Sequence, residues 1–71
     1  MTPRYPNAIV PANIDGNAFV ILAHASRALR NAGATREEIE QYRTDATSGD
    51  YDNLLRVTVQ WITFGDEDGD E

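Results

Sequence analysis

The sequence of 71 residues contains no cysteine and no lysine, and it has one histidine and no glycine-rich phosphate loop. Without cysteine the chain can form neither disulfide bonds nor thiolate metal sites, so we expect an apolar core, helix caps or self-association to hold the fold together. A single histidine leaves little material for a metal centre or a nucleophile–base pair. These absences predict a protein that is not an enzyme and that needs no cofactor and no metal.

Long apolar runs are also missing. No stretch approaches the roughly 20 apolar residues that cross a bilayer, and residues 1–6, MTPRYP, lack the apolar segment of a signal peptide. We therefore expect a cytoplasmic protein that does not bind membranes. Because so short a chain buries a small share of its surface, we also expect modest stability and consider a homodimer.

The negative charge is concentrated at one end of the chain. Residues 66–71, DEDGDE, hold five of the twelve acids, whereas residues 1–65 carry seven acids and six arginines. The formal net charge of −6 is therefore mostly a property of the last residues. We predict one compact domain over residues 1–65 and a disordered, solubilising acidic tail over residues 66–71, with an interaction tail as the alternative.

The first elements are predicted from turn formers and β-branched residues. Residues 7–14, NAIVPANI, favour a strand, and Pro11, which has no amide proton to donate, places it at a sheet edge or ends it early. The following Asp15-Gly16-Asn17 turns the chain and supplies a cap for a helix over residues 17–32.

The two sides of this helix differ in polarity. One side carries apolar residues at helical spacing, with Ile21, Ala28, Phe19 and Ser26 on its shoulders. The central residues of that side are Ala18, Leu22, Ala25, Leu29 and Ala32. The opposite arc combines an apolar residue with basic ones, so we take it as the candidate interaction face. It consists of Val20, His24, Arg27 and Arg30.

A second helix is predicted over residues 35–47. Gly33 suits the left-handed position beyond the first helix, and Thr35 with Glu38 forms a capping-box pattern. The apolar stripe of this helix is narrow, which places it on the surface with one side docked. The stripe consists of Ile39, Tyr42 and Ala46. Gly49 is expected to end the helix, and Asp50 is placed to cap the next one.

The residues after Asp50 fit two periodicities. A helical stripe runs through Tyr51, Leu54, Leu55, Val59 and Ile62, whereas residues 56–64 are rich in β-branched and aromatic residues. We predict a helix over residues 51–60 and a strand over residues 61–64 that pairs with the first strand. A longer strand from Val57 is the alternative. The expected fold class is α+β, with an N-terminal strand, three helices and a short C-terminal strand in a two-stranded ribbon packed on the helices.

Side chains that could carry chemistry have structural explanations. His24 and Ser26 are two residues apart on a helix, so they point in nearly opposite directions and cannot pair. Trp61 is expected in the core, whereas for Tyr5 core and interface stay open. Residues 29–39 resemble a helix-turn-helix, but the acidic start of the second helix, REEIE, would face phosphates. Nucleic-acid binding is therefore not favoured.

Several segments resemble a group of small uncharacterised proteins from bacteria, especially actinobacteria, and their phages. The segments are YPN at residues 5–7, DGNAF at 15–19, RALRNAG at 27–33, EEI at 37–39, ATSGDYDNLL at 46–55, and Trp61. The resemblance implies no activity, cofactor or site residue. It supports helix between residues 55 and 61, because such relatives have fewer β-branched residues there. Pro11 and the acids after Phe64 depart from the pattern.

Together these features predict a non-enzymatic protein-interaction module. We expect a small phage or phage-derived accessory factor that binds a host or phage protein, in the host cytoplasm if a phage encodes it. One alternative is an acidic mimic of nucleic acid that inhibits a defence or regulatory protein through residues 66–71. Another is weak nucleic-acid binding through the arginines.

Overall fold

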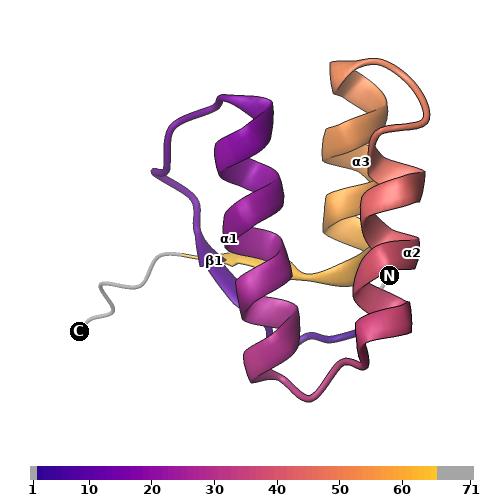
Figure 1. The fold of residues 1–71 in the computed structure, drawn as a ribbon. Coiled ribbons are helices and arrows are strands. Elements are labelled where there is room, and N and C mark those ends of the chain that lie inside the picture. Colours follow the sequence, from indigo (N-terminus) through magenta and orange to yellow (C-terminus); the bar gives the residue numbers. More distant parts are fainter. Residues whose placement is uncertain (1, 66–71) are drawn as a thin grey trace.

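The computed structural model describes residues 2–65, so the predicted acidic tail over residues 66–71 lies outside the described residues. The elements confirm the predicted α+β class, with two short strands at the ends of a three-helix chain (Figure 1). In chain order they are β1 (Ile9–Pro11), α1 (Ala18–Asn31), α2 (Arg36–Ala46), α3 (Tyr51–Trp61) and β2 (Thr63–Gly65).

Each helix begins at a cap that satisfies a free amide of its first turn. Asn17 accepts a hydrogen bond from an amide of α1, and Asp15 in turn accepts one from Asn17. Thr35 and Glu38 form the complete capping box of α2, and Asp50 caps α3. The predicted helix starts are therefore correct to within one residue.

The helices end in different ways. Gly33 has a φ of 102°, so it takes the left-handed position after α1 as predicted. Gly49 does not take a left-handed conformation, and α2 ends at Ala46, so the prediction that Gly49 ends this helix is wrong. The hydroxyls of Thr47 and Ser48 instead donate to carbonyl oxygens of the last turn of α2, at 2.7 Å each. Gly49 avoids crowding, because a Cβ there would lie 3.0 Å from Asn53.

β1 and β2 pair in parallel, with Ile9 opposite Thr63 and Pro11 opposite Gly65. The amide of Thr63 donates to Ala8 at 2.9 Å, and the amide of Ala12 donates to Gly65 at 3.1 Å. In a parallel ladder this pattern turns the backbone groups of Ile9 and Pro11 toward the free edge. The missing amide proton of Pro11 thus leaves no ladder bond unmade, although the strand is shorter than the predicted 7–14.

The three helices connect the two strands. Successive helices run in opposite directions through short loops, and α1 lies alongside the strands (Figure 1). The helical prediction for residues 51–60 is confirmed and extends to Trp61, so the longer strand from Val57 is wrong. The chain becomes extended at Ile62 and enters β2 two residues later than predicted.

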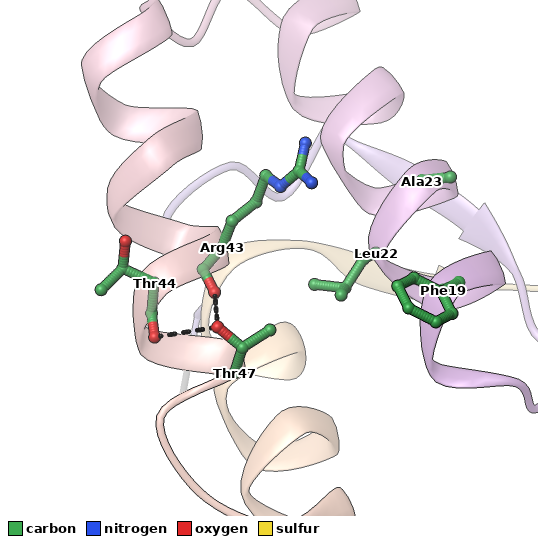
Figure 2. Close-up of a pocket in the computed structure, with 6 residues that line it drawn as sticks. All are labelled: Phe19, Leu22, Ala23, Arg43, Thr44 and Thr47. Carbon is green, nitrogen blue, oxygen red and sulfur yellow. Dashed lines mark hydrogen bonds between the residues drawn. The ribbon is translucent and has the colours of Figure 1, made fainter.

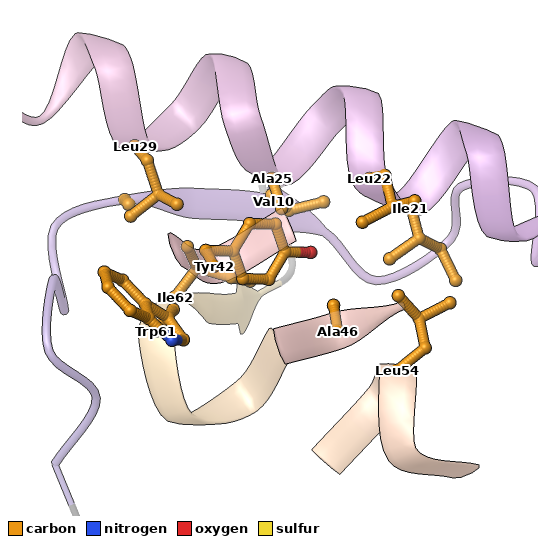
Figure 3. Packing of buried hydrophobic residues seen from close by; sticks show 11 residues of the cluster. Val10, Ile21, Leu22, Ala25, Leu29, Tyr42, Ala46, Leu54, Trp61 and Ile62 are labelled. Carbon is orange, nitrogen blue, oxygen red and sulfur yellow. The ribbon is translucent and has the colours of Figure 1, made fainter. Parts of the chain in front are cut away.

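The core lies between α1, α2, α3 and the sheet (Figure 3). Its apolar members are Ala8, Val10, Ile21, Leu22, Ala25, Leu29, Tyr42, Ala46, Leu54, Trp61 and Ile62. The core position expected for Trp61 is confirmed, with its ring edge-on to Tyr42 at a centroid distance of 6.1 Å.

The predicted stripe of α3 is exposed at two of its positions, Tyr51 at 46% and Val59. Val59 is 51% exposed, and the neighbouring Thr58 is fully buried in its place. The Thr58 hydroxyl donates to the Leu54 carbonyl at 2.7 Å and lies 2.8 Å from the Tyr42 hydroxyl. Because the single hydroxyl proton of Thr58 is donated to Leu54, the Tyr42 hydroxyl must be the donor in its bond to Thr58. This bond satisfies the one buried phenol, and burial raises its pKa.

The N-terminal segment is attached to the end of α3. The amides of Arg4 and Tyr5 each donate at 2.9 Å to carbonyls of the last two residues of α3, and the Arg4 guanidinium lies 4.6 Å from the centre of the Trp61 ring. The Tyr5 hydroxyl donates to Glu38 at 2.6 Å. This bond is the main reason that the pKa of Glu38 is lowered and that of Tyr5 raised.

Candidate interaction surface

The predicted interaction face of α1 is exposed at three of its four positions. His24, Arg27 and Arg30 are exposed, and we call these three residues the basic face of α1. Val20, predicted on the same outer arc, is half-buried, so only part of its side chain is accessible. Val20 therefore adds less apolar surface to this face than a fully exposed valine would.

A pocket of about 430 Å³ opens where the start of α1 faces the end of α2 (Figure 2). Its α1 wall is apolar and its α2 wall is polar. The lining residues are Phe19, Leu22, Ala23, Arg43, Thr44 and Thr47. Phe19, predicted on the shoulder of the inner side, is 82% exposed. Helical periodicity placed it toward the core, but its neighbour across the pocket is the polar end of α2.

A second pocket of about 420 Å³ lies farther along the same two helices, where the end of α1 faces the start of α2. Its lining carries three guanidinium groups and one carboxylate. The residues are Arg30, Ala34, Arg36, Ile39, Glu40 and Arg43. The arginines give this pocket a positive charge that a carboxylate or phosphate ligand would neutralise.

The two pockets lie next to each other between α1 and α2, because Arg43 lines both of them. Its side chain projects from α2 into the space between the helices (Figure 2). We call these two neighbouring pockets together the α1–α2 groove. From Phe19 to Arg30 it follows eleven helical steps, or about 16 Å. One end of the groove is therefore apolar and the other basic.

Arginines gather on this side of the molecule. Arg30, Arg36 and Arg43 line the groove, and Arg27 lines a small adjacent pocket with His24 and Ala23. Because Ala23 also lines the apolar end, the basic face of α1 and the groove are contiguous. Four of the six arginines thus share one surface of a protein whose net charge is negative.

A third pocket, of about 250 Å³, lies at the opposite edge of α1 beside β2 and is largely apolar. Its lining residues are Ala12, Ile14, Asp15, Gly16, Ile21, Tyr51, Leu55 and Phe64. Tyr51 is 46% exposed, and its hydroxyl donates to the carbonyl of Gly16, which fastens the loop before α1 to α3. We call this feature the β2 pocket.

Most polar side chains that sequence reasoning could suspect of chemistry have structural partners. Asn17, Thr35, Glu38 and Asp50 are engaged in helix caps. His24 is exposed, whereas the Ser26 hydroxyl is buried without a hydrogen-bond partner, so the structure does not bring these two side chains together. Within residues 2–65, no three histidine or acidic side chains are grouped to hold a metal ion.

In the same described part of the chain, no helix has the length and apolarity required to cross a bilayer. Comparison of the chain with protein-family models, with curated proteins and with solved structures gives no match.

The groove was not visible in the sequence. The basic face lies on one helix, so helical periodicity could predict it. Arg36 and Arg43 belong to another helix, and only the packing of α2 against α1 brings them beside Arg30. The absence of lysine from the sequence does not indicate where the arginines gather, so no sequence signal marked the groove.

Proposed function

We propose that this protein is a non-enzymatic interaction module that binds a protein partner through the basic face of α1 and the adjoining α1–α2 groove. The observation that carries the proposal is the gathering of four of six arginines on this surface. Arginine is well suited to interfaces, since its planar guanidinium can bind carboxylates in two-point contacts. The engagement of other polar groups in caps supports a binding role over a catalytic one.

The biological setting belongs to the same proposal. The resemblance of segments such as DGNAF at 15–19 and ATSGDYDNLL at 46–55 to small actinobacterial and phage proteins supports an accessory factor of phage origin. Such a factor would act on a host or phage protein in the cytoplasm.

The test is quantitative affinity purification from cells in which the protein occurs naturally. The variant H24A/R27A/R30A removes the basic face while leaving the half-buried Val20 intact. The matched control is R56A, which removes an exposed arginine of α3. We expect the triple variant to lose proteins that the wild type and R56A retain. If a folded triple variant recovers the same proteins in the same amounts, the proposed function is wrong.

A second proposal is an acidic mimic of nucleic acid that inhibits a defence or regulatory protein. Its specific support is the run of five acids within residues 66–71. Deletion of these residues separates the two proposals, because inhibition by a mimic would collapse whereas binding through α1 would persist. Weak binding to nucleic acid is separated from both by a mobility-shift assay at low salt, in which we expect no shift.

Homodimerisation remains a prediction, and the β2 pocket is the surface that we propose for it. Its apolar lining and the exposed Tyr51 are typical of an interface between copies. Analytical ultracentrifugation checks this, since a dimer through the β2 pocket should dissociate in Y51E and not in R30A.

A further inference from the structure

We infer that the α1–α2 groove binds an acidic segment of a partner protein that carries one large apolar side chain. The carboxylates of the segment occupy the end lined by Arg30, Arg36 and Arg43, and the apolar side chain packs on Phe19. This inference rests on the proposed interaction function and specifies the chemistry of the partner.

The basic end is complementary to carboxylates. Three guanidinium groups line this pocket against the single carboxylate of Glu40, so the pocket carries excess positive charge. The three arginines are exposed. A guanidinium presents a planar set of donors that matches the two oxygens of a carboxylate. A segment with several acidic residues therefore neutralises the positive charge of this end and accepts hydrogen bonds from its guanidinium groups.

The apolar end selects against a ligand that consists of charge alone. Phe19 is 82% exposed and lies beside Leu22 and Ala23, which line the same pocket. Burying so exposed an aromatic ring against another apolar side chain is favourable in free energy, because apolar surface leaves water. A nucleic-acid backbone offers phosphates at the basic end but no aliphatic side chain for Phe19.

The geometry of the groove sets a spacing for the partner segment. Phe19 and Arg30 are separated along α1 by about 16 Å. A helical segment spans this distance in about eleven residues, and an extended segment spans it in about five. The apolar residue and the acidic cluster of the partner should therefore be separated by one of these two intervals.

The experiment uses the full 71-residue chain and synthetic peptides of defined sequence. Each peptide carries one leucine and a cluster of three glutamates, separated by either the helical or the extended interval. Matched peptides replace the glutamates with glutamine or the leucine with alanine. Isothermal titration calorimetry at low salt measures affinity. We expect one of the two spacings to bind, and we expect both matched peptides to bind more weakly.

Protein variants then locate the binding site. Arg43→Ala should weaken binding by about tenfold, the loss expected for one charge-assisted hydrogen-bonded contact. Phe19→Ala should lower the affinity for the leucine peptide and leave the affinity for the alanine peptide almost unchanged. Arg56→Ala, an exposed arginine on α3, is the control and should bind like the wild type. Phe19 and Arg43 lie outside the triple variant that tests the proposed function.

Three results would overturn the inference. The first is failure of both glutamate spacings, or equal binding of the glutamine peptide. The second is an oligothymidylate that binds more tightly than the peptides and depends on Arg43, which would make the groove a nucleic-acid site. The third is self-association that Arg43→Ala and deletion of residues 66–71 both abolish, which would assign the groove to a second copy. If the peptides fail while the triple variant still loses its partner, only the chemistry of the groove is wrong.

Discussion

The two sides of α2 differ in how their polar groups are used. On the side toward α3, Tyr42 is fully buried, and its hydroxyl lies 2.8 Å from that of Thr58. The next residue, Arg43, faces α1 and lines the open α1–α2 groove. Adjacent residues of one helix thus belong to surfaces with different roles.

This difference separates stability from recognition. Buried polar groups that are fully hydrogen-bonded fix one packing arrangement, so the α2–α3 contact holds the fold together. Exposed arginines contribute little to folding and remain available to a ligand. Substitutions on the side of α2 toward α3 should therefore lower the free energy of unfolding. Substitutions on the side toward α1 should weaken ligand binding and leave the free energy of unfolding almost unchanged.

The largest effect on stability is expected from Trp61→Ala. Trp61 is buried against Tyr42 and beneath the Arg4 guanidinium, so its removal should cost about 3–5 kcal/mol. Urea unfolding followed by circular dichroism measures the loss. Val59→Ala on the same helix is the control, because Val59 is 51% exposed. Equal losses for the two variants would contradict the assignment of the core.

Removing either hydroxyl of the Tyr42–Thr58 hydrogen bond should destabilise the protein less than Trp61→Ala does, and the two substitutions should differ in cost. Thr58→Val leaves the buried Tyr42 hydroxyl without a partner and should cost about 1–3 kcal/mol. Tyr42→Phe should cost less, about 1 kcal/mol, because the Thr58 hydroxyl still donates to Leu54. The double variant should lose less than the sum of the two. Additive losses in urea unfolding would mean that the two hydroxyls do not interact.

The bond between Tyr5 and Glu38 predicts a dependence of stability on pH. This bond lowers the pKa of Glu38 below its ordinary value of 4.5, so its stabilising effect is present above pH 4.5 and is lost as pH falls through the lower folded value. Tyr5→Phe removes the largest cause of the shift. The difference in unfolding free energy between wild type and Tyr5→Phe should therefore narrow below pH 4.5. A difference that stays constant down to acidic pH would show that Glu38 is not the partner.

The smallest effect on stability is expected in the groove. Arg30→Ala and Arg43→Ala should each change the free energy of unfolding by no more than about 0.5 kcal/mol, as is usual for exposed positions. Urea unfolding of the two variants checks this. Losses as large as that of Thr58→Val would mean that the arginines serve the fold, and the contrast between the two sides of α2 would disappear.

The sequence predicted the features that depend on neighbouring residues. A cap within Asp15-Gly16-Asn17, the caps at Thr35 and Asp50, and the left-handed Gly33 follow from local hydrogen bonding and backbone geometry, and they were predicted correctly. The α+β class followed from these helix boundaries together with the β-branched and aromatic residues of the two predicted strands.

Features that depend on packing were missed. Thr58 takes a core position that hydrophobicity assigned to Val59, because a threonine becomes a good core residue only when a hydroxyl such as that of Tyr42 reaches it. The exposure of Phe19 depends on where α2 ends opposite α1. Periodicity describes the faces of one helix, whereas a groove needs the relative position of two.

The most direct test of the central claim is a map of amide chemical-shift changes when a binding glutamate–leucine peptide is added to the ¹⁵N-labelled full chain. We predict that the shift changes concentrate at the groove, from Phe19 to Arg30 on α1 and from Arg36 to Thr47 on α2. The chemical shifts of the α3 amides from Leu54 to Trp61 should remain unchanged. Changes centred instead on the β2 pocket, at Tyr51, Leu55 and Phe64, would contradict the account.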